Sequence, residues 1–189
     1  MGSERGFAFA VWLTGLPASG KSGIARALAE ILEGKGIRAA VLDSDAVRRE
    51  ITPCATYGET ERDAFYATLA YLARELSSHG VPVVVAATAN RKAYRDRARA
   101  EIPRFLEVYV RCPLAVCRAR DPKGIYRRGA EGSAPNVPGL TSPYEPPETP
   151  EVVVDGDRDP PAESARRIVL ALEAKGFLPA GENGPPGIG

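Results

Sequence analysis

Residues 10–28 read AVWLTGLPASGKSGIARAL, and this segment decides the fold. Its first part belongs to an apolar run, Phe7–Thr14, that predicts a buried strand, and its last part opens a helical pattern, Lys21–Glu33. The letters between them, GLPASGKS at 15–22, match the pattern GxxxxGK[ST] in full. The backbone N–H groups of such a loop point at phosphate oxygens, and the helix that follows adds a partial positive charge. The segment therefore predicts a phosphate-binding loop (P-loop) at the end of a strand in an α/β sheet.

The P-loop also predicts which side chains touch the phosphates. Lys21 is expected to reach the β and γ phosphates of a bound nucleotide, and the Ser22 hydroxyl is expected to ligate magnesium. The other predicted ATP-binding residues of the loop are Gly15, Leu16, Pro17, Ala18, Ser19 and Gly20. A chance match on a glycine-rich turn is the alternative, which the strand-loop-helix context disfavours. The motif indicates a nucleoside triphosphate, but switch GTPases, motor ATPases and metabolite kinases share it.

Beyond the P-loop, short apolar runs alternate with helical patterns. The predicted strands are Phe7–Thr14, Ile37–Leu42, Val81–Ala87, Phe105–Val110 and Val152–Val154. The predicted helices are Lys21–Glu33, Glu61–Ser78, Arg91–Glu101, Leu114–Arg120 and Ala162–Lys175. This alternation is typical of an α/β fold, a three-layer sandwich with a mainly parallel five-stranded sheet, as in P-loop nucleoside triphosphate hydrolases and kinases. Ligands of such sheets bind beyond the carboxyl ends of the strands.

Length and composition favour one domain. Of the 189 residues, we assign 1–177 to a single P-loop domain. Residues 121–150 are rich in glycine, proline and charge, and a long loop without predicted secondary structure is typical of a lid. Residues 178–189 lack the apolar side chains needed to pack and are expected to form a flexible tail.

The charge balance excludes some classes of partner. Lys and Arg number 25 against 24 Asp and Glu, so nucleic acid and membrane surfaces are not expected partners. No apolar run approaches the roughly 20 residues of a membrane helix, and the start of the chain does not read as an export signal. The three cysteines show no CxxC spacing and fit reduced thiols. We therefore expect a cytoplasmic protein with small-molecule partners.

An acidic turn follows the second predicted strand. The letters VLDSDAVR at 41–48 place Asp43 and Asp45 at the carboxyl end of that strand. A carboxylate there can take or orient the proton of an attacking hydroxyl, or hold magnesium through water. Arg48, one helical turn further, can grip an anionic substrate with its planar guanidinium. The alternative is that Asp43 caps a helix and Arg48 is a solvated charge.

Four segments together resemble the adenylyl-sulfate kinase family, in the same order and spacing. They read GLPASGKS at 15–22, LDSDAVRRE at 42–50, RARDPKGIYRR at 118–128 and SPYEPPETPEVVV at 142–154. The last two are much more specific to the family than the first. The resemblance implies an ATP-dependent kinase that uses Mg²⁺ and phosphorylates the 3′-hydroxyl of adenylyl sulfate, and a possible homodimer.

The resemblance also implies roles for individual residues. Lys21, Asp45 and Lys123 would be catalytic, and Arg118 would touch ATP. The implied acceptor-binding residues are Asp43, Asp45, Arg48, Tyr57, Arg62, Phe65, Lys123 and Val137. The implied lid residues beside Lys123 are Asp121, Gly124, Tyr126, Arg127 and Arg128. Magnesium would be held by Ser22 and Asp45. For the basic residues of the lid, the alternative is a run of solvated charges.

The sequence departs from the family pattern on the acceptor side. Phe65 stands where the family has an asparagine, and Val137 replaces one of two phenylalanines that clamp the substrate adenine, the other being Tyr57. A phenylalanine-isoleucine-serine-proline segment is replaced by Ala87-Thr88-Ala89-Asn90. These departures fit either a different small anionic acceptor or the same acceptor with rearranged contacts. A nucleotide-binding switch without kinase activity is a third reading, opposed by the basic lid and by the absence of an Asn-Lys-x-Asp motif.

Overall fold

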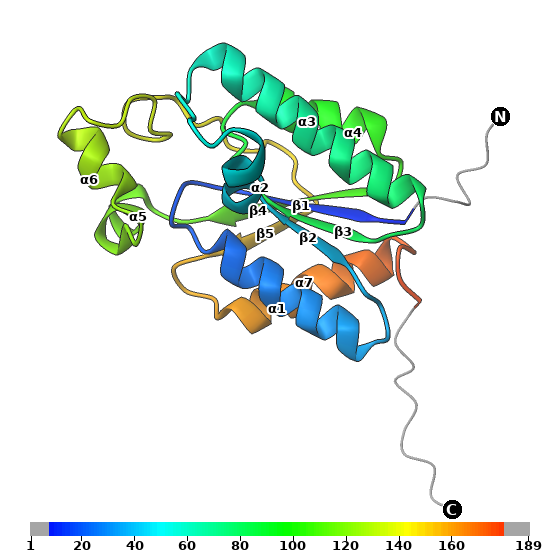
Figure 1. Ribbon diagram of the computed structural model, residues 1–189. Helices are drawn as coiled ribbons and strands as arrows, with labels where there is room; N and C mark the ends of the chain where they lie inside the picture. The colour runs from blue at the N-terminus through cyan, green and yellow to red at the C-terminus, as the bar shows by residue number, and fades with distance from the viewer. Residues whose placement is uncertain (1–7, 180–189) are drawn as a thin grey trace, which may run out of the picture.

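In the computed structural model, which describes residues 8–179, the strands form a parallel sheet in the order β2-β3-β1-β4-β5 (Figure 1). The strands are β1 Ala10–Thr14, β2 Ala40–Asp43, β3 Val83–Ala86, β4 Phe105–Arg111 and β5 Val152–Asp155. The helices are α1 Lys21–Gly34, α2 Ser44–Ile51, α3 Glu59–Ser78, α4 Lys92–Glu101, α5 Leu114–Arg120, α6 Ile125–Ala130 and α7 Pro161–Ala174. The five predicted strands and five predicted helices are all present, with ends shifted by a few residues.

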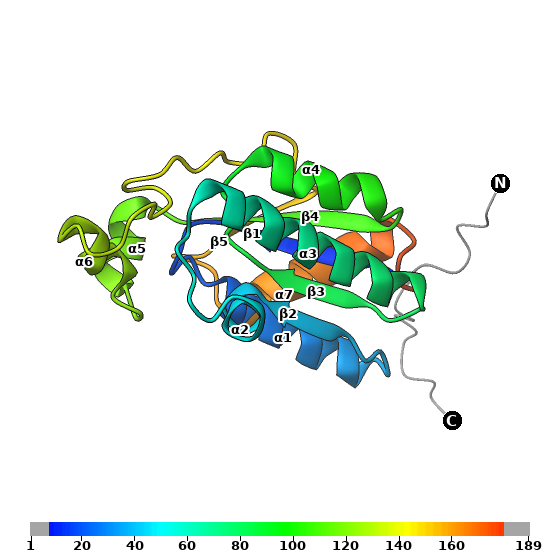
Figure 2. The ribbon, with the colours of Figure 1, turned by 45° about the horizontal axis from the view of Figure 1, so that its top comes forward.

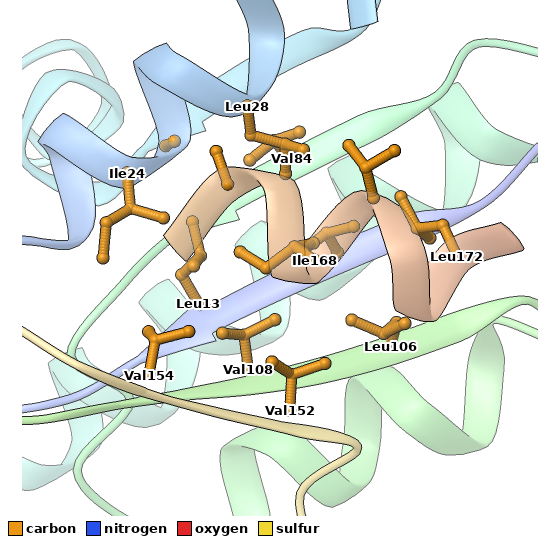
Figure 3. Close-up of a cluster of buried hydrophobic side chains, with 14 of the residues drawn as sticks. Leu13, Ile24, Leu28, Val84, Leu106, Val108, Val152, Val154, Ile168 and Leu172 are labelled. Atoms are coloured by element: carbon orange, nitrogen blue, oxygen red, sulfur yellow. The ribbon is translucent and has the colours of Figure 1, made fainter. Parts of the chain in front are cut away.

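Helices cover both faces of the sheet. Figures 1 and 2 show α1 and α7 on one face and α3 with α4 on the other. Because side chains alternate along a strand, Leu13 of β1 joins Leu28 and Ile168 in the core under α1 and α7 (Figure 3), whereas its neighbour Trp12 joins Phe65 on the opposite face. Both cores are buried, which confirms the predicted three-layer sandwich.

Two helices were not predicted. The short helix α2 begins directly after β2, with Asp43 as its N-cap. Helix α6 lies inside the predicted lid, so the expectation of a segment without secondary structure is wrong for Ile125–Ala130. Tyr126 and Val137 form a small buried cluster there with two cysteines of the α5 region, which gives the lid an apolar core of its own. In Figure 1, α5 and α6 lie beyond the carboxyl ends of the strands.

The packed part of the chain extends past the predicted domain end. Leu178, the first residue of the predicted tail, is only 6% exposed and packs in the core under α1 and α7. Residues 180–189, which hold the rest of that tail, lie outside the described residues. Within residues 8–179, no helix is both long enough and apolar enough to span a bilayer.

A buried ion pair ties α4 to β4. Arg95 is 2% exposed and donates to Glu107 Oε1 at 2.8 Å. Its other nitrogens donate to the carbonyl oxygens of Ala89 and Glu145, at 2.6 and 2.8 Å. Arg99 donates to the second oxygen of Glu107, so both carboxylate oxygens are paired. Arg95 therefore holds the end of β3 and the end of the lid against the sheet.

We expect Arg95→Leu to lower the free energy of unfolding by about 3 kcal/mol, because it leaves one carboxylate oxygen of Glu107 and two carbonyl groups without their buried donor. Urea denaturation monitored by circular dichroism measures the change. Arg97→Leu is the matched control, since Arg97 is exposed on the same helix and should cost less than about 0.5 kcal/mol. Equal losses in the two variants would contradict the role given to Arg95.

Candidate active site

The P-loop runs from β1 into α1 with the backbone its motif requires. Gly20 has a φ of 105°, in the left-handed region that side chains rarely adopt. At Gly15 a Cβ atom would lie 2.5 Å from the carbonyl oxygen of Val110, so only glycine fits beside β4. Gly156, after β5, approaches the loop as closely, since a Cβ there would lie 2.0 Å from the Ser19 carbonyl oxygen. No local sequence pattern predicts this contact, which holds the loop from the β5 side.

Lys21 lies inside the loop that it serves. Its Nζ donates to the carbonyl oxygens of Gly15 and Leu16, at 2.9 and 2.7 Å. Burial lowers the pKa of Lys21 to about 8, against the opposing attraction of Asp45 and Asp43. In the free protein the Lys21 Nζ donates to neutral carbonyl oxygens, and a bound polyphosphate would give it negatively charged partners.

We expect the affinity for a nucleoside triphosphate to fall at alkaline pH. Phosphates favour the protonated amine, so binding raises the pKa of Lys21 above its value of about 8 in the free protein. The affinity is therefore full below that value and falls above it, by up to about tenfold per pH unit. Calorimetric titration with a non-hydrolysable analogue between about pH 7.5 and about 9.5 measures the slope.

The Lys21→Arg variant is the control for this titration. Arginine stays protonated over the whole range, so the affinity of this variant should be independent of pH whatever its level. An equal slope in both proteins would show that Lys21 does not cause the dependence.

Asp43 joins the P-loop to the start of α2. Its Oδ2 accepts a hydrogen bond from Ser22 Oγ at 2.6 Å, while Oδ1 accepts from the backbone N–H groups of Asp45 and Ala46. Burial opposes ionisation, but these hydrogen bonds outweigh it and hold the pKa of Asp43 below its usual value. Asp43 is therefore both a helix cap, as the alternative reading had it, and an ionised neighbour of Ser22.

Asp45 faces the lid. Its Oδ2 accepts a hydrogen bond from Nζ of Lys123, 78 residues further along the chain. Ser22 hydrogen bonds with Asp43 rather than with Asp45, so the structure places Asp43 next to the predicted magnesium ligand Ser22. Within residues 8–179 no group of three or more His, Cys, Asp or Glu side chains is placed so that it could hold a metal ion.

A cavity of about 640 Å³ lies between the P-loop, α2, α3, the end of β3 and the lid. Eight Lys and Arg side chains line it against three Asp, although the whole chain has a net charge of only +1. The cations are Lys21, Arg26, Arg48, Arg49, Arg62, Arg120, Lys123 and Arg128. Such a surplus in one cavity attracts polyanions of small size.

Two buried arginines occupy the α2 and α3 side of this cavity. Arg48 is 8% exposed and donates to Glu61 at 2.7 Å, so it is not the solvated charge of the alternative reading. Its guanidinium lies over the rings of Phe65 and Tyr57, at 3.7 and 4.9 Å from their centroids. Phe65 supplies no hydrogen bond, but its ring stacks on Arg48 through a cation–π contact. Arg62 is also 8% exposed and contacts Asn90 and Asn136.

The lid contacts the P-loop directly. The Tyr126 hydroxyl donates to the Pro17 carbonyl oxygen at 3.0 Å, and burial raises the pKa of this phenol above its ordinary value. Arg128 lines the cavity, whereas Arg127 is exposed and its backbone N–H donates to Asp121. Gly124 has a φ of 62° where α6 begins.

Other predicted site residues have different surroundings. Arg118 is exposed and does not line the cavity, whereas Arg120 lines it and donates to the Gly156 carbonyl oxygen at 2.7 Å. Side chains two residues apart point to opposite sides of a helix, so Arg120 faces the cavity and Arg118 does not. Val137 lines the cavity but is 3% exposed, because it packs into the lid cluster. Asn90 does not cap α4; its side chain bonds to Arg62 and to the lid.

Comparisons with known proteins point to one family of kinases. A family model for adenylylsulphate kinase matches residues 7–155. A probable adenylyl-sulfate kinase of Archaeoglobus fulgidus is 42% identical over 151 residues, which are 80% of this chain and 97% of that protein. The probable bifunctional SAT/APS kinase 2 of Sorangium cellulosum is 37% identical over 90% of this chain but only 29% of its own length. The structure of the Mycobacterium tuberculosis APS kinase with AMPPNP and APS has a TM-score of 0.83 at 33% identity, over 88% of this chain and 98% of that one.

Proposed function

The chain belongs to the adenylylsulphate kinase family, and on this premise we propose that it transfers the γ-phosphoryl group of ATP to the 3′-hydroxyl of adenylyl sulfate. One observation carries the proposal: the P-loop, Asp45 and the buried arginines Arg48 and Arg62 all line one cavity. In the sequence, Asp45 stands between Asp43, which contacts the P-loop, and Arg48. A triphosphate on the P-loop and an anionic nucleotide at the arginines would therefore meet at Asp45.

The P-loop side would hold and polarise ATP. Lys21 would exchange its bonds to the Gly15 and Leu16 carbonyl oxygens for bonds to the β and γ phosphates. Arg120 and Arg128 add positive charge from the lid side. These cations stabilise the charge that develops on the transferred group and on the leaving ADP.

The residues present fit a magnesium ion. The Ser22 hydroxyl and the Asp43 carboxylate lie 2.6 Å apart, and two oxygen ligands of this kind are what Mg²⁺ takes from a protein when phosphate oxygens and water complete its shell. Ser22 and Asp43 would hold it, while Asp45, the ligand expected from the sequence, would reach it through water. Bound there, the ion would neutralise charge on the β and γ phosphates.

Asp45 would act on the acceptor hydroxyl. The 3′-oxygen forms a bond to the γ phosphorus as the bond to the oxygen shared with the β phosphate breaks, and Asp45 takes the hydroxyl proton. Lys123 pairs with Asp45 in the free protein and lies within reach of the same place. We propose that Lys123 shifts toward the phosphates when the lid, 121–150, closes over both substrates and excludes water.

Arg48 and Arg62 would bind the phosphosulfate. Both are buried and line the cavity, and charge-assisted bonds from a planar guanidinium suit a divalent anion of this shape. Tyr57 is 43% exposed and offers one aromatic face for the adenine, while the buried Val137 offers only an apolar contact.

A coupled assay of ADP release tests the proposal. ADP should form only when adenylyl sulfate is present, and mass spectrometry should find the acceptor with one added phosphoryl group. If ADP formed only with another hydroxyl-bearing anion, that anion and not adenylyl sulfate would be the acceptor. Tight ATP binding without turnover on any acceptor would contradict kinase activity. A homodimer and a cytoplasmic location, both expected from the sequence, stay predictions; light scattering after size-exclusion chromatography tests the first.

A further inference from the structure

Asn90 follows β3 and is one of the few polar side chains buried in the cavity wall. It is 3% exposed, and both ends of its carboxamide are used. Oδ1 accepts a hydrogen bond from Arg62 Nη1 at 3.3 Å, and Nδ2 donates to the Pro143 carbonyl oxygen of the lid at 3.0 Å. An arginine needs an acceptor and a carbonyl needs a donor, so only one orientation of the amide satisfies both.

The partners of Asn90 come from two distant parts of the chain, α3 and the lid. Arg62 belongs to α3, 28 residues before Asn90, and Pro143 to the lid, 53 residues after it. The Asn90 carbonyl oxygen also accepts from the backbone N–H of Glu145, at 2.8 Å. The second guanidinium nitrogen of Arg62 donates to the Asn136 carbonyl oxygen, again in the lid. Asn90 therefore joins the arginine and the lid at one point.

Arg62 has few other means of keeping its orientation. No carboxylate is bound to it among the hydrogen bonds and ion pairs of residues 8–179, in contrast to Arg48, which Glu61 holds. The Tyr57 ring lies 6.0 Å from its guanidinium carbon, at the limit of a cation–π contact. A neutral amide fixes the guanidinium without cancelling its charge, which leaves that charge available to an anion.

We propose that Asn90 is a positioning residue for acceptor binding, which holds the Arg62 guanidinium in the cavity and ties it to the lid. This inference rests on the proposed function. Its consequence is that the affinity for the anionic acceptor depends on Asn90, whereas the affinity for ATP, held at the P-loop, does not. Closure of the lid and the orientation of Arg62 are then coupled through Asn90, in addition to the direct hydrogen bond from Arg62 to the Asn136 carbonyl oxygen of the lid.

We expect Asn90→Ala to raise the KM for adenylyl sulfate about tenfold, as the loss of one hydrogen bond to a charged group predicts, with the KM for ATP changed less than about twofold. Steady-state kinetics with each substrate varied in turn measures the split. The matched control is Tyr144→Phe, which removes a different hydrogen bond of the lid, to Thr14, without touching Arg62. An unchanged KM for adenylyl sulfate in Asn90→Ala, or an equal rise in Tyr144→Phe, would overturn the inference.

A double-mutant cycle separates positioning from a general effect on folding. If Asn90 acts through Arg62, then Asn90→Ala should have no further effect on the acceptor KM in the Arg62→Ala background. Additive effects would contradict the proposal. If Asn90→Ala does not fold, Asn90→Asp serves instead, since it keeps the size and the acceptor atom. The carboxylate of Asn90→Asp would compete with the anionic substrate for the Arg62 guanidinium, so the acceptor KM should rise more than about tenfold. An unchanged acceptor KM would overturn the inference.

The two proposals fail in different ways. If the wild-type protein shows no turnover with adenylyl sulfate, the proposed function has failed. Crystal structures of the wild-type protein and of Asn90→Ala then test the positioning role by themselves. The Arg62 guanidinium should then lose its single orientation in Asn90→Ala, and an unchanged orientation would overturn the inference by itself.

Discussion

Replacing Lys21 with alanine is expected to lower kcat by about 10³-fold to 10⁵-fold, the range seen when one cation is removed from a transferring phosphoryl group. Lys21 is 9% exposed, and its Nζ donates to carbonyl oxygens of the loop. Positions 15–22 hold no other charged residue, so no neighbouring side chain of the P-loop can replace its charge. The coupled ADP assay at saturating ATP measures the loss.

The control for Lys21→Ala is another lysine from the same part of the chain. Lys35 stands at the end of α1, 38% exposed and paired with Glu173, and Lys35→Ala should leave kcat within about twofold. Circular dichroism should show both variants folded. A kcat for Lys21→Ala within about tenfold of the wild type would refute the role given to this amine.

The second large effect is expected for Asp45→Asn, with kcat lowered by about 10²-fold to 10⁴-fold, the usual contribution of a positioned general base. The amide has the same size as the carboxylate but does not take a proton from the acceptor hydroxyl. Asp45 is half exposed and makes its contact with the lid through Lys123, so the change should leave the fold and the affinity for an ATP analogue nearly unaltered. Kinetics and calorimetric titration measure the two quantities.

Lys123→Met and Asp96→Asn complete this experiment. Asp96 is an exposed acid paired with Lys92 on α4, and its replacement should change kcat less than about twofold. Because Lys123 is itself proposed to bind the phosphates, Lys123→Met should also lower kcat. If Asp45 served only as the partner of Lys123, Asp45→Asn would lower kcat no further in the Lys123→Met background. A near-normal kcat in Asp45→Asn would mean that another group takes the proton.

The resemblance to a kinase family predicted acceptor-side residues but not their contacts. Phe65 stands where the family has an asparagine, and in the structure its ring stacks on the Arg48 guanidinium at 3.7 Å. The resemblance implies that Ser22 and Asp45 hold magnesium, whereas in the structure Ser22 hydrogen bonds with Asp43. Arg118 is expected to touch ATP, yet Arg120, two residues further along α5, is the one that lines the cavity. In each case the residue type was informative, while the direction of the side chain was not contained in the local pattern.

The sequence by itself determined the P-loop, the five strands and the alternation of strands with helices. These features depend on local properties: glycines where the backbone needs them, apolar runs at strand spacing and apolar residues at helical spacing. The motif at 15–22 predicts the phosphate site for the same reason, since strand, loop and helix are consecutive in the chain.

Only the tertiary structure decided how the site is assembled. Ser22 meets Asp43 across 21 residues, Arg62 meets Asn90 across 28, and Asp45 meets Lys123 across 78. These contacts exist because the order β2-β3-β1-β4-β5 brings the ends of distant strands to one edge, where the lid packs on its own apolar cluster. A hydrogen bond between side chains depends on distance and angle within a few tenths of an ångström, and local sequence patterns do not encode such geometry for segments far apart in the chain.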